Sequence, residues 1–143
     1  MRFHHMAVFV SNMEAAIRLW QDVLGFKIIF DAEIPDGNEP GPGIYMTPAL
    51  LDDIFGVTNA RSRMVLMMSE EKAIIELQQC LNPAIEKTPA ENLRYGHPGF
   101  HELGLSEDDI DGRIMKIKEA GYETQTDNER PSARIGRSFL YSD

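Results

Sequence analysis

Ionisable side chains that interrupt apolar segments are the first candidates for chemistry in this sequence. Glu76 lies among the aliphatic residues of segment 74–77, and burying a carboxylate without a partner is costly. Glu76 is therefore a metal ligand, an acid in a pocket or one half of an ion pair. His5 lies in the apolar run of residues 3–10. It is either a core histidine with a satisfied ring or a group that faces a pocket.

The segment that contains His5 recurs near the other end of the chain. Each copy combines an apolar strand, a polar N-cap and a glycine that ends the helix: residues 3–10, Asn12 and Gly25 in the first copy, and residues 100–106, Asp109 and Gly121 in the second. Short polar side chains suit the N-cap, and glycine suits the position after a helix. Alternate strand residues share a face, so His5 is grouped with Ala7 and Phe9, and His4 points the other way.

The elements between and after the two copies follow from apolar periodicity and from turn residues. In the first half we expect a helix over 13–24, a strand over 26–30, a loop-rich insert over 32–47, a short helix over 50–55 and strands over 63–68 and 73–79. In the second half we expect a helix that starts after Asp109 and ends at Gly121, and strands over 122–126 and 137–141. Residues 1–143 thus form a single domain with module one over 1–81, a linker over 82–99 and module two over 100–143.

The second module lacks one strand in this sequence. The counterpart of the strand that holds Glu76 would lie several residues beyond Asp143. We expect either that the protein lacks this strand or that the sequence is incomplete at its end.

Charge and cysteine content limit the partners and the compartment. The net charge is −9, with 14 Lys and Arg against 23 Asp and Glu, which argues against binding to nucleic acid or to an anionic membrane surface. No apolar run reaches the length of about 18 residues that a membrane span needs. Cys80 is the single cysteine, so an internal disulfide is excluded and a reducing compartment, the cytoplasm, is expected. A small molecule or another protein remains as the partner.

The sequence resembles the vicinal oxygen chelate superfamily, which includes glyoxalases, extradiol dioxygenases, epimerases, fosfomycin-modifying enzymes and bleomycin-binding proteins. The resemblance lies in residues 5–12, 19–26, 74–77, 102–111 and 138–143. It implies an α+β fold with two βαβββ modules, whose sheets form an open half-barrel around a pocket. It covers nearly the whole chain and is specific for the fold, whereas this fold hosts several chemistries.

The resemblance also implies a metal site. Carried over to this sequence, the first three ligands fall on His5, Glu76 and Glu102, and the fourth falls beyond the sequence. The family usually has histidine where Glu102 stands, so a shifted register that uses His101, or no metal at all, remains open. An imidazole with carboxylates suits a divalent ion such as Fe, Mn, Zn, Ni or Co. Glu102 could instead pair with Arg63 or Arg137.

The function implied is that of a small-molecule metalloenzyme of the glyoxalase/dioxygenase type, either a lyase or isomerase or a dioxygenase. Glu102 would act as third ligand or as the general base that removes a proton next to a carbonyl. The alternative is a metal-free protein that binds or sequesters a ligand, as bleomycin resistance proteins do. A third reading is a regulatory or dimerisation domain with a degenerate pocket. We expect a homodimer.

Overall fold

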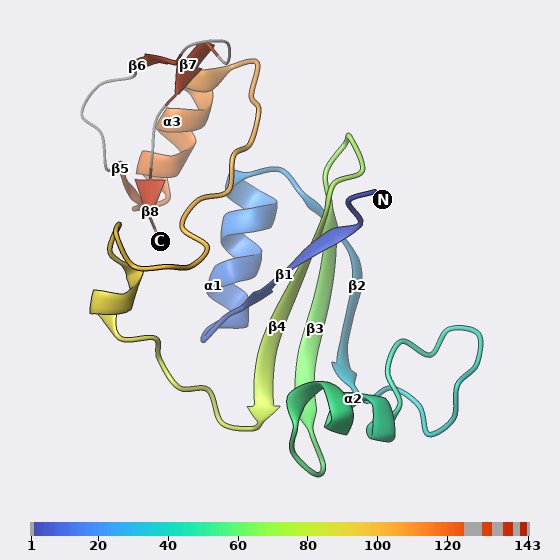
Figure 1. Cartoon of the computed structure of the whole chain (residues 1–143). Coiled ribbons are helices and arrows are strands. Elements are labelled where there is room, and N and C mark those ends of the chain that lie inside the picture. Colours follow the sequence, from blue (N-terminus) through green and yellow to red (C-terminus); the bar gives the residue numbers. More distant parts are fainter. Residues whose placement is uncertain (1, 125–129, 133–135, 139–140, 143) are drawn as a thin grey trace. The chain divides into compact units, whose positions relative to one another are not determined.

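The computed structural model describes residues 2–124, 130–132, 136–138 and 141–142, with side chains through residue 124. The chain divides into two compact units, Met1–Gly99 and Phe100–Asp143. The first unit contains β1 (His5–Phe9), α1 (Met13–Arg18), the π-helix η1 (Leu19–Val23), β2 (Lys27–Ile34), α2 (Pro48–Phe55), β3 (Arg61–Met68), β4 (Ile74–Asn82) and the 3-10 helix η2 (Ala90–Leu93) (Figure 1).

The first unit is built on a four-stranded sheet in the order β1-β4-β3-β2 (Figure 1). β1 pairs with β4 in parallel, and the other neighbours are antiparallel. A parallel pair needs a long crossover connection, and the helix between β1 and β2 begins that crossover. This β-α-β-β-β order and the open, curved sheet confirm the mixed α+β fold predicted from the sequence.

One face of the sheet, here called the outer face, holds an apolar core. It carries four buried side chains from the two central strands: Val65, Met67, Ile75 and Leu77. The helical segment α1–η1 lies on this side, because the backbone N–H of Met13 donates to Gln79 Oε1 at 3.2 Å and Gln79 shares this face. Asn12 caps the helix as predicted, accepting from the Ala15 N–H at 3.1 Å. The predicted helix over 13–24 therefore forms, with a change to π-helix after Arg18.

The opposite face, here called the inner face, is covered at one end by α2. A second buried cluster joins that helix to the sheet, and its members are Ile34, Leu51, Ala60 and Met64, with Phe30, Met46, Phe55, Val57 and Leu66 packed around them. Thr47 caps α2 and Gly56 ends it with φ 66°, a left-handed conformation that suits glycine. The helix predicted over 50–55 thus starts two residues earlier.

The second unit contains α3 (Ile110–Glu119) and four short strands in two antiparallel pairs. The pairs are β5 (Glu123–Thr124) with β8 (Tyr141–Ser142), and β6 (Arg130–Ser132) with β7 (Gly136–Ser138). Asp109 caps α3 by accepting from the Gly112 N–H at 3.0 Å, as predicted. Parts of the predicted strands over 122–126 and 137–141 lie outside the described residues.

The strand predicted over Phe100–Ser106 is wrong. Residues 100–106 have no regular secondary structure and are exposed. The physical reason lies in the composition of the segment: it has no β-branched residue, and Gly104 interrupts it. The first copy, in contrast, has Val8 and Val10 and an adjacent strand with which to pair.

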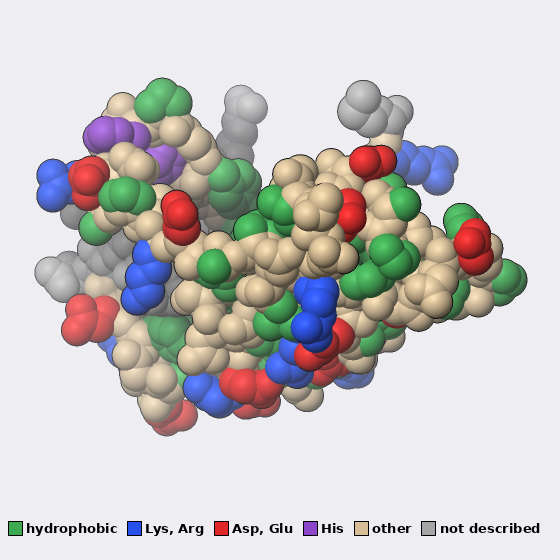
Figure 2. Space-filling view, turned by 90° about the horizontal axis from the view of Figure 1, so that it is seen from below, with side chains coloured by type: hydrophobic (Ala, Val, Ile, Leu, Met, Phe, Trp, Pro, Cys, Tyr) green, Lys and Arg blue, Asp and Glu red, His purple; other side chains and the backbone are tan. Residues whose placement is uncertain are grey.

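The surface mixes both signs of charge. Figure 2 shows acidic and basic side chains interspersed on the face viewed, with hydrophobic side chains between them. No helix within the described ranges is both long enough and apolar enough to span a bilayer.

Candidate metal centre

His5 and Glu76 meet on the inner face of the sheet. In the parallel pair, Ala7 lies opposite Glu76 and His5 lies opposite Ile74, so His5 and Glu76 are diagonal neighbours on adjacent strands. His5 Nε2 lies 3.6 Å from Glu76 Oε2. The side chain of His5 is 40% exposed and that of Glu76 is 14% exposed. Two of the three predicted site residues are therefore brought together on a face that solvent reaches.

Two polar side chains that were not predicted from the sequence hold Glu76 through hydrogen bonds. Gln78 Nε2 donates to Glu76 Oε1 at 2.7 Å, and Ser62 Oγ donates to Gln78 Oε1 at 2.6 Å. Ser62 is fully buried and Gln78 is 4% exposed. Gln78 follows Glu76 by two positions, which places both on one strand face. That spacing could have identified Gln78 from the sequence. Ser62 lies on another strand and comes close to Gln78 only because of the register of β3 with β4.

His4, the residue that precedes β1, contacts the ring of His5. The two Nδ1 atoms lie 2.7 Å apart, so one ring donates and the other accepts. Donation from His5 Nδ1 to His4 leaves the Nε2 lone pair of His5 pointed toward Glu76. Histidine ligands of metals commonly donate their other ring N–H in this way, which fixes the tautomer and the ring orientation.

Glu102 belongs to the second unit, in the irregular stretch that precedes α3, where its side chain is exposed. His101 is its exposed neighbour in the same stretch. The alternation that selected Glu102 over His101 requires a strand, and residues 101–107 do not form one. The role of Glu102 as third ligand or base stays a prediction.

The donor atoms of His5 and Glu76 fit a shared divalent ion. An imidazole nitrogen and a carboxylate oxygen bind such ions at about 2.0–2.2 Å, so two adjacent ligands lie about 3–4 Å apart. The observed 3.6 Å falls in that interval. Over residues 2–124 and the three short described segments that follow, no three His, Cys, Asp or Glu side chains gather closely enough to hold an ion. The pair is thus the unit from which a site would be built.

Arg63, one predicted alternative partner for Glu102, is engaged on the outer face. Its Nε and Nη2 donate to the two carboxylate oxygens of Asp31 at 2.9 and 2.8 Å, and its Nη1 donates to Glu14 Oε1 at 2.5 Å. The hydrogen bond from Arg63 lowers the pKa of Asp31, and the same bonds raise the pKa of Arg63. This cluster ties α1 to β2 and β3, which is a structural role.

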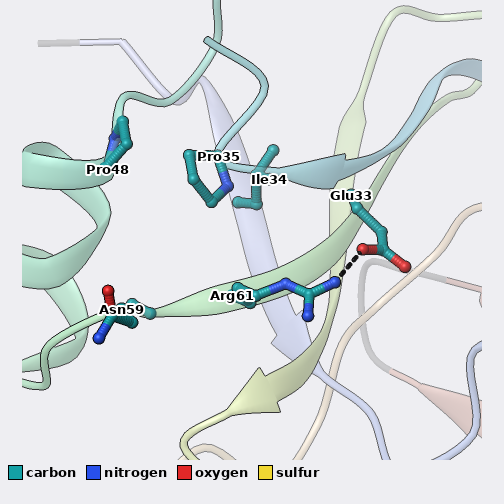
Figure 3. Close-up of a pocket in the computed structure, with 7 residues that line it drawn as sticks. Glu33, Ile34, Pro35, Pro48, Asn59 and Arg61 are labelled. Carbon is teal, nitrogen blue, oxygen red and sulfur yellow. Dashed lines mark hydrogen bonds and ion pairs between the residues drawn. The ribbon is translucent and has the colours of Figure 1, made fainter. Parts of the chain in front are cut away.

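A pocket of about 380 Å³ lies at the other end of the sheet, between β2, the start of β3 and the start of α2 (Figure 3). Its two charged side chains pair with each other, since Arg61 Nη2 lies 2.6 Å from Glu33 Oε2. The remaining lining residues that Figure 3 labels, Ile34, Pro35, Pro48 and Asn59, carry no titratable group. No histidine lines this pocket, and its one carboxylate is already paired with Arg61.

Known structures share this fold. A glyoxalase family protein from Bacillus cereus superposes with a TM-score of 0.73 at 14% identity, over 99% of this chain and 93% of the other. The fosfomycin resistance protein FosX from Mesorhizobium loti gives a TM-score of 0.56 at 17% identity, over 99% and 82%. A FosX point mutant from Listeria monocytogenes, complexed with Mn(II) and 1S,2S-dihydroxypropylphosphonic acid, gives 0.53 at 17% identity, over 99% and 81%.

Sequence comparison gives the family. No curated protein matches the chain. The family model for the glyoxalase/bleomycin resistance protein/dioxygenase superfamily matches residues 4–141, nearly the whole chain. The chain therefore belongs to the glyoxalase/bleomycin resistance protein/dioxygenase superfamily.

Proposed function

We propose that this protein is a small-molecule metalloenzyme of the glyoxalase/dioxygenase type, with a divalent ion held by His5 and Glu76. The observation that carries the proposal is the 3.6 Å separation of His5 Nε2 and Glu76 Oε2 on the solvent-reached inner face. The FosX mutant with bound Mn(II) supports it, because that protein shares the fold. The donor set is compatible with Fe, Mn, Zn, Ni or Co.

The chain's own groups would divide the work. His5 presents Nε2, and Glu76 presents Oε2, while the hydrogen bond from Gln78 holds the other carboxylate oxygen. A bound ion would supply Lewis acidity to a carbonyl or to neighbouring oxygens of a small molecule. Glu102 would complete the site as third ligand or serve as the base that takes a proton next to that carbonyl. The reaction is then that of a lyase or isomerase, or that of a dioxygenase.

Apolar side chains further along the same face as His5 would form the other part of the site. Phe9, on the same strand face as His5, is 60% exposed. Its ring centroid lies 6.0 Å from that of Phe55 at the end of α2. Pockets for small molecules are mostly apolar with a few converging polar groups. We therefore propose a partly apolar substrate that offers oxygen atoms to His5 and Glu76.

The test is metal analysis of protein purified without chelator, for the parent and for His5→Ala and Glu76→Ala. The parent should carry about one equivalent of a divalent ion, and each variant should lose most of it. Glu71→Ala is the matched control, because Glu71 is an exposed acid in the turn before β4. A parent with far less than one equivalent, unchanged by either substitution, would refute the proposal.

A second candidate function is metal-free ligand binding of the bleomycin-resistance type. The observation in its favour is that His5 Nε2 and Glu76 Oε2 already lie 3.6 Å apart, and Gln78 already satisfies the second carboxylate oxygen. Calorimetric titration with bleomycin in the presence of EDTA separates the two. Tight binding without turnover supports this candidate, and binding that EDTA abolishes opposes it.

We also propose a homodimer in the cytoplasm. β1 is an edge strand of its sheet, and the exposed Phe3 and Phe9 lie at or next to it. Burial raises the pKa of the Cys80 thiol, which favours the unreactive protonated form. Sedimentation at several protein concentrations tests the dimer, and a single species with the mass of one chain would contradict it.

A further inference from the structure

A continuous hydrogen-bonded path runs under the proposed metal pair. It starts at Ser62 on β3, passes through the side-chain amide of Gln78 on β4 and ends at Glu76 Oε1, with distances of 2.6 and 2.7 Å. All three side chains lie on the inner face, because Ser62 pairs with Cys80 and the alternate residues of β4 share one side. The path therefore connects a buried hydroxyl to the more exposed carboxylate that faces His5.

The chemistry of the end group fixes the direction of the path. An ionised carboxylate only accepts hydrogen bonds, so Gln78 must present its NH₂ group to Glu76. Its carbonyl oxygen then faces Ser62, whose hydroxyl has one proton to donate. Ser62 Oγ also lies 3.1 Å from the Gln79 carbonyl and 3.3 Å from the Arg63 carbonyl, but the contact with Gln78 is the shortest. The donors and acceptors are consistent with a single orientation of the Gln78 amide.

Ser62 and Gln78 occupy buried positions at which apolar side chains would normally pack. Ser62 is fully buried, and Gln78 is 4% exposed and lies opposite the buried Met64 on β3. A buried amide or hydroxyl is costly unless it is hydrogen-bonded, and an aliphatic residue would fill the same volume without that cost. Each buried polar atom of the path has a hydrogen-bond partner, since no buried side-chain N or O atom lacks one in the described part of the chain. Its effect is to hold one oxygen of Glu76.

We propose that Gln78 is a positioning residue for the metal pair, with Ser62 as the group that orients it. Gln78 occupies Glu76 Oε1 and so leaves Oε2 as the oxygen that faces His5 Nε2. This inference rests on the proposed function, because it assigns the path a role toward the ion held by His5 and Glu76. It implies that Glu76 binds the ion through one oxygen only.

The test compares two neighbouring glutamines in the full-length chain. Gln78→Met keeps the length of the side chain and removes the donor to Glu76. Gln79→Met is the matched control, because Gln79 lies on the outer face and bonds the start of α1, accepting from Met13 N and donating to the Ser11 carbonyl. Mn(II) alone is the probe, and the EPR signal of the free ion gives the affinity. Circular dichroism checks that each variant is folded.

We expect Gln78→Met to weaken Mn(II) binding by about 10–100-fold, the usual effect of losing an outer-shell partner. Gln79→Met should leave the affinity within about two-fold, and Ser62→Ala should lower it in the direction of Gln78→Met. Loss of binding in Glu76→Ala together with unchanged binding in Gln78→Met would overturn the positioning role and leave the proposed function intact. A parent that binds no Mn(II) would overturn the proposed function and the positioning role with it.

A second readout needs no metal and no substitution of Gln78 or Ser62. In ¹⁵N-labelled protein, Glu76→Ala should shift the side-chain NH₂ signals of Gln78 and leave those of Gln79 in place. A merely structural amide, bonded to Ser62 alone, would keep its signals. Unmoved Gln78 signals would therefore contradict the path even if Gln78→Met failed to fold.

Discussion

The segments before the two capped helices differ in structure. His5–Phe9 is a strand that pairs along its length with β4, whereas residues 101–107 form no regular secondary structure. Yet both helices start in the same way, with a side-chain oxygen of Asn12 or Asp109 that accepts from the N–H three residues on. A cap is a local interaction, and so the repeat preserves it. A strand needs a partner and suitable side chains, and only the first copy has Val8 and the neighbouring β4.

This difference has a consequence for the site. β1 holds His5 against Glu76 because parallel pairing with β4 sets the register. Glu102 stands at the position of the second copy that corresponds to His5 in the first. It does not lie in a paired strand that would fix the direction of its side chain.

The largest effect is expected in the core of the first sheet. Leu77→Ala removes a fully buried side chain from β4, which should lower the free energy of unfolding by about 2–5 kcal/mol through lost burial and a cavity. Leu81→Ala, on the same strand but 45% exposed, is the control and should cost less than about 1 kcal/mol. Urea unfolding followed by circular dichroism measures both. Equal costs for the two substitutions would contradict the packing described for the outer face.

The helix caps should respond equally in both copies. Asn12→Ala and Asp109→Ala each remove the acceptor from the first turn of a helix, and each should cost about 1 kcal/mol of stability. Glu119→Ala, at the exposed far end of α3, is a control that keeps the cap. Urea midpoints measure the three variants. A neutral Asp109→Ala beside a costly Asn12→Ala would show that the two copies differ in their helices as well as in their strands.

The smallest effect is expected for the outer-face cluster, and it depends on pH. The hydrogen bond from Arg63 lowers the pKa of Asp31 below its ordinary value of 3.8. A carboxyl with a lowered folded-state pKa contributes stability above its unfolded pKa and loses it as pH falls through the folded pKa. Asp31→Asn should therefore cost at most about 1 kcal/mol at pH 7, since the pair is a third exposed. Below about pH 4 the variant and the parent should converge.

Thermal unfolding between pH 2 and 7 follows this convergence. Glu33→Gln is the matched control, because Glu33 also pairs with an arginine, Arg61, but both side chains are more than half exposed. At pH 7 it should change stability by less than Asp31→Asn. A gap between Asp31→Asn and the parent that widened in acid would contradict the assigned ion pair.

The sequence predicts the local features of this protein well and the long-range ones in part. The apolar neighbours of Glu76 and the alternation around His5 correctly placed both residues in strands, because these signals are local. The helix caps were correct for the same reason. The support from Ser62 could not be predicted, since it depends on the register between β3 and β4, which tertiary packing sets.

Other differences have equally physical origins. The strand predicted over 26–30 extends to Ile34, because β2 pairs with β3 along its whole length after a bulge between Ile28 and Phe30. The predicted strand over 100–106 does not form, because a repeated sequence pattern does not by itself repeat a strand and Gly104 weakens this segment. The choice between His101 and Glu102 depended on that strand.

The central claim is that His5 and Glu76 share a divalent ion, and paramagnetic broadening by Mn(II) tests it most directly. Sub-stoichiometric Mn(II) added to ¹⁵N-labelled parent protein should broaden the backbone signals around His5 in β1 and around Glu76 in β4 before any others. The same addition to Glu76→Ala should leave those signals sharp. Broadening that is centred elsewhere, or that persists around His5 in Glu76→Ala, would contradict the account.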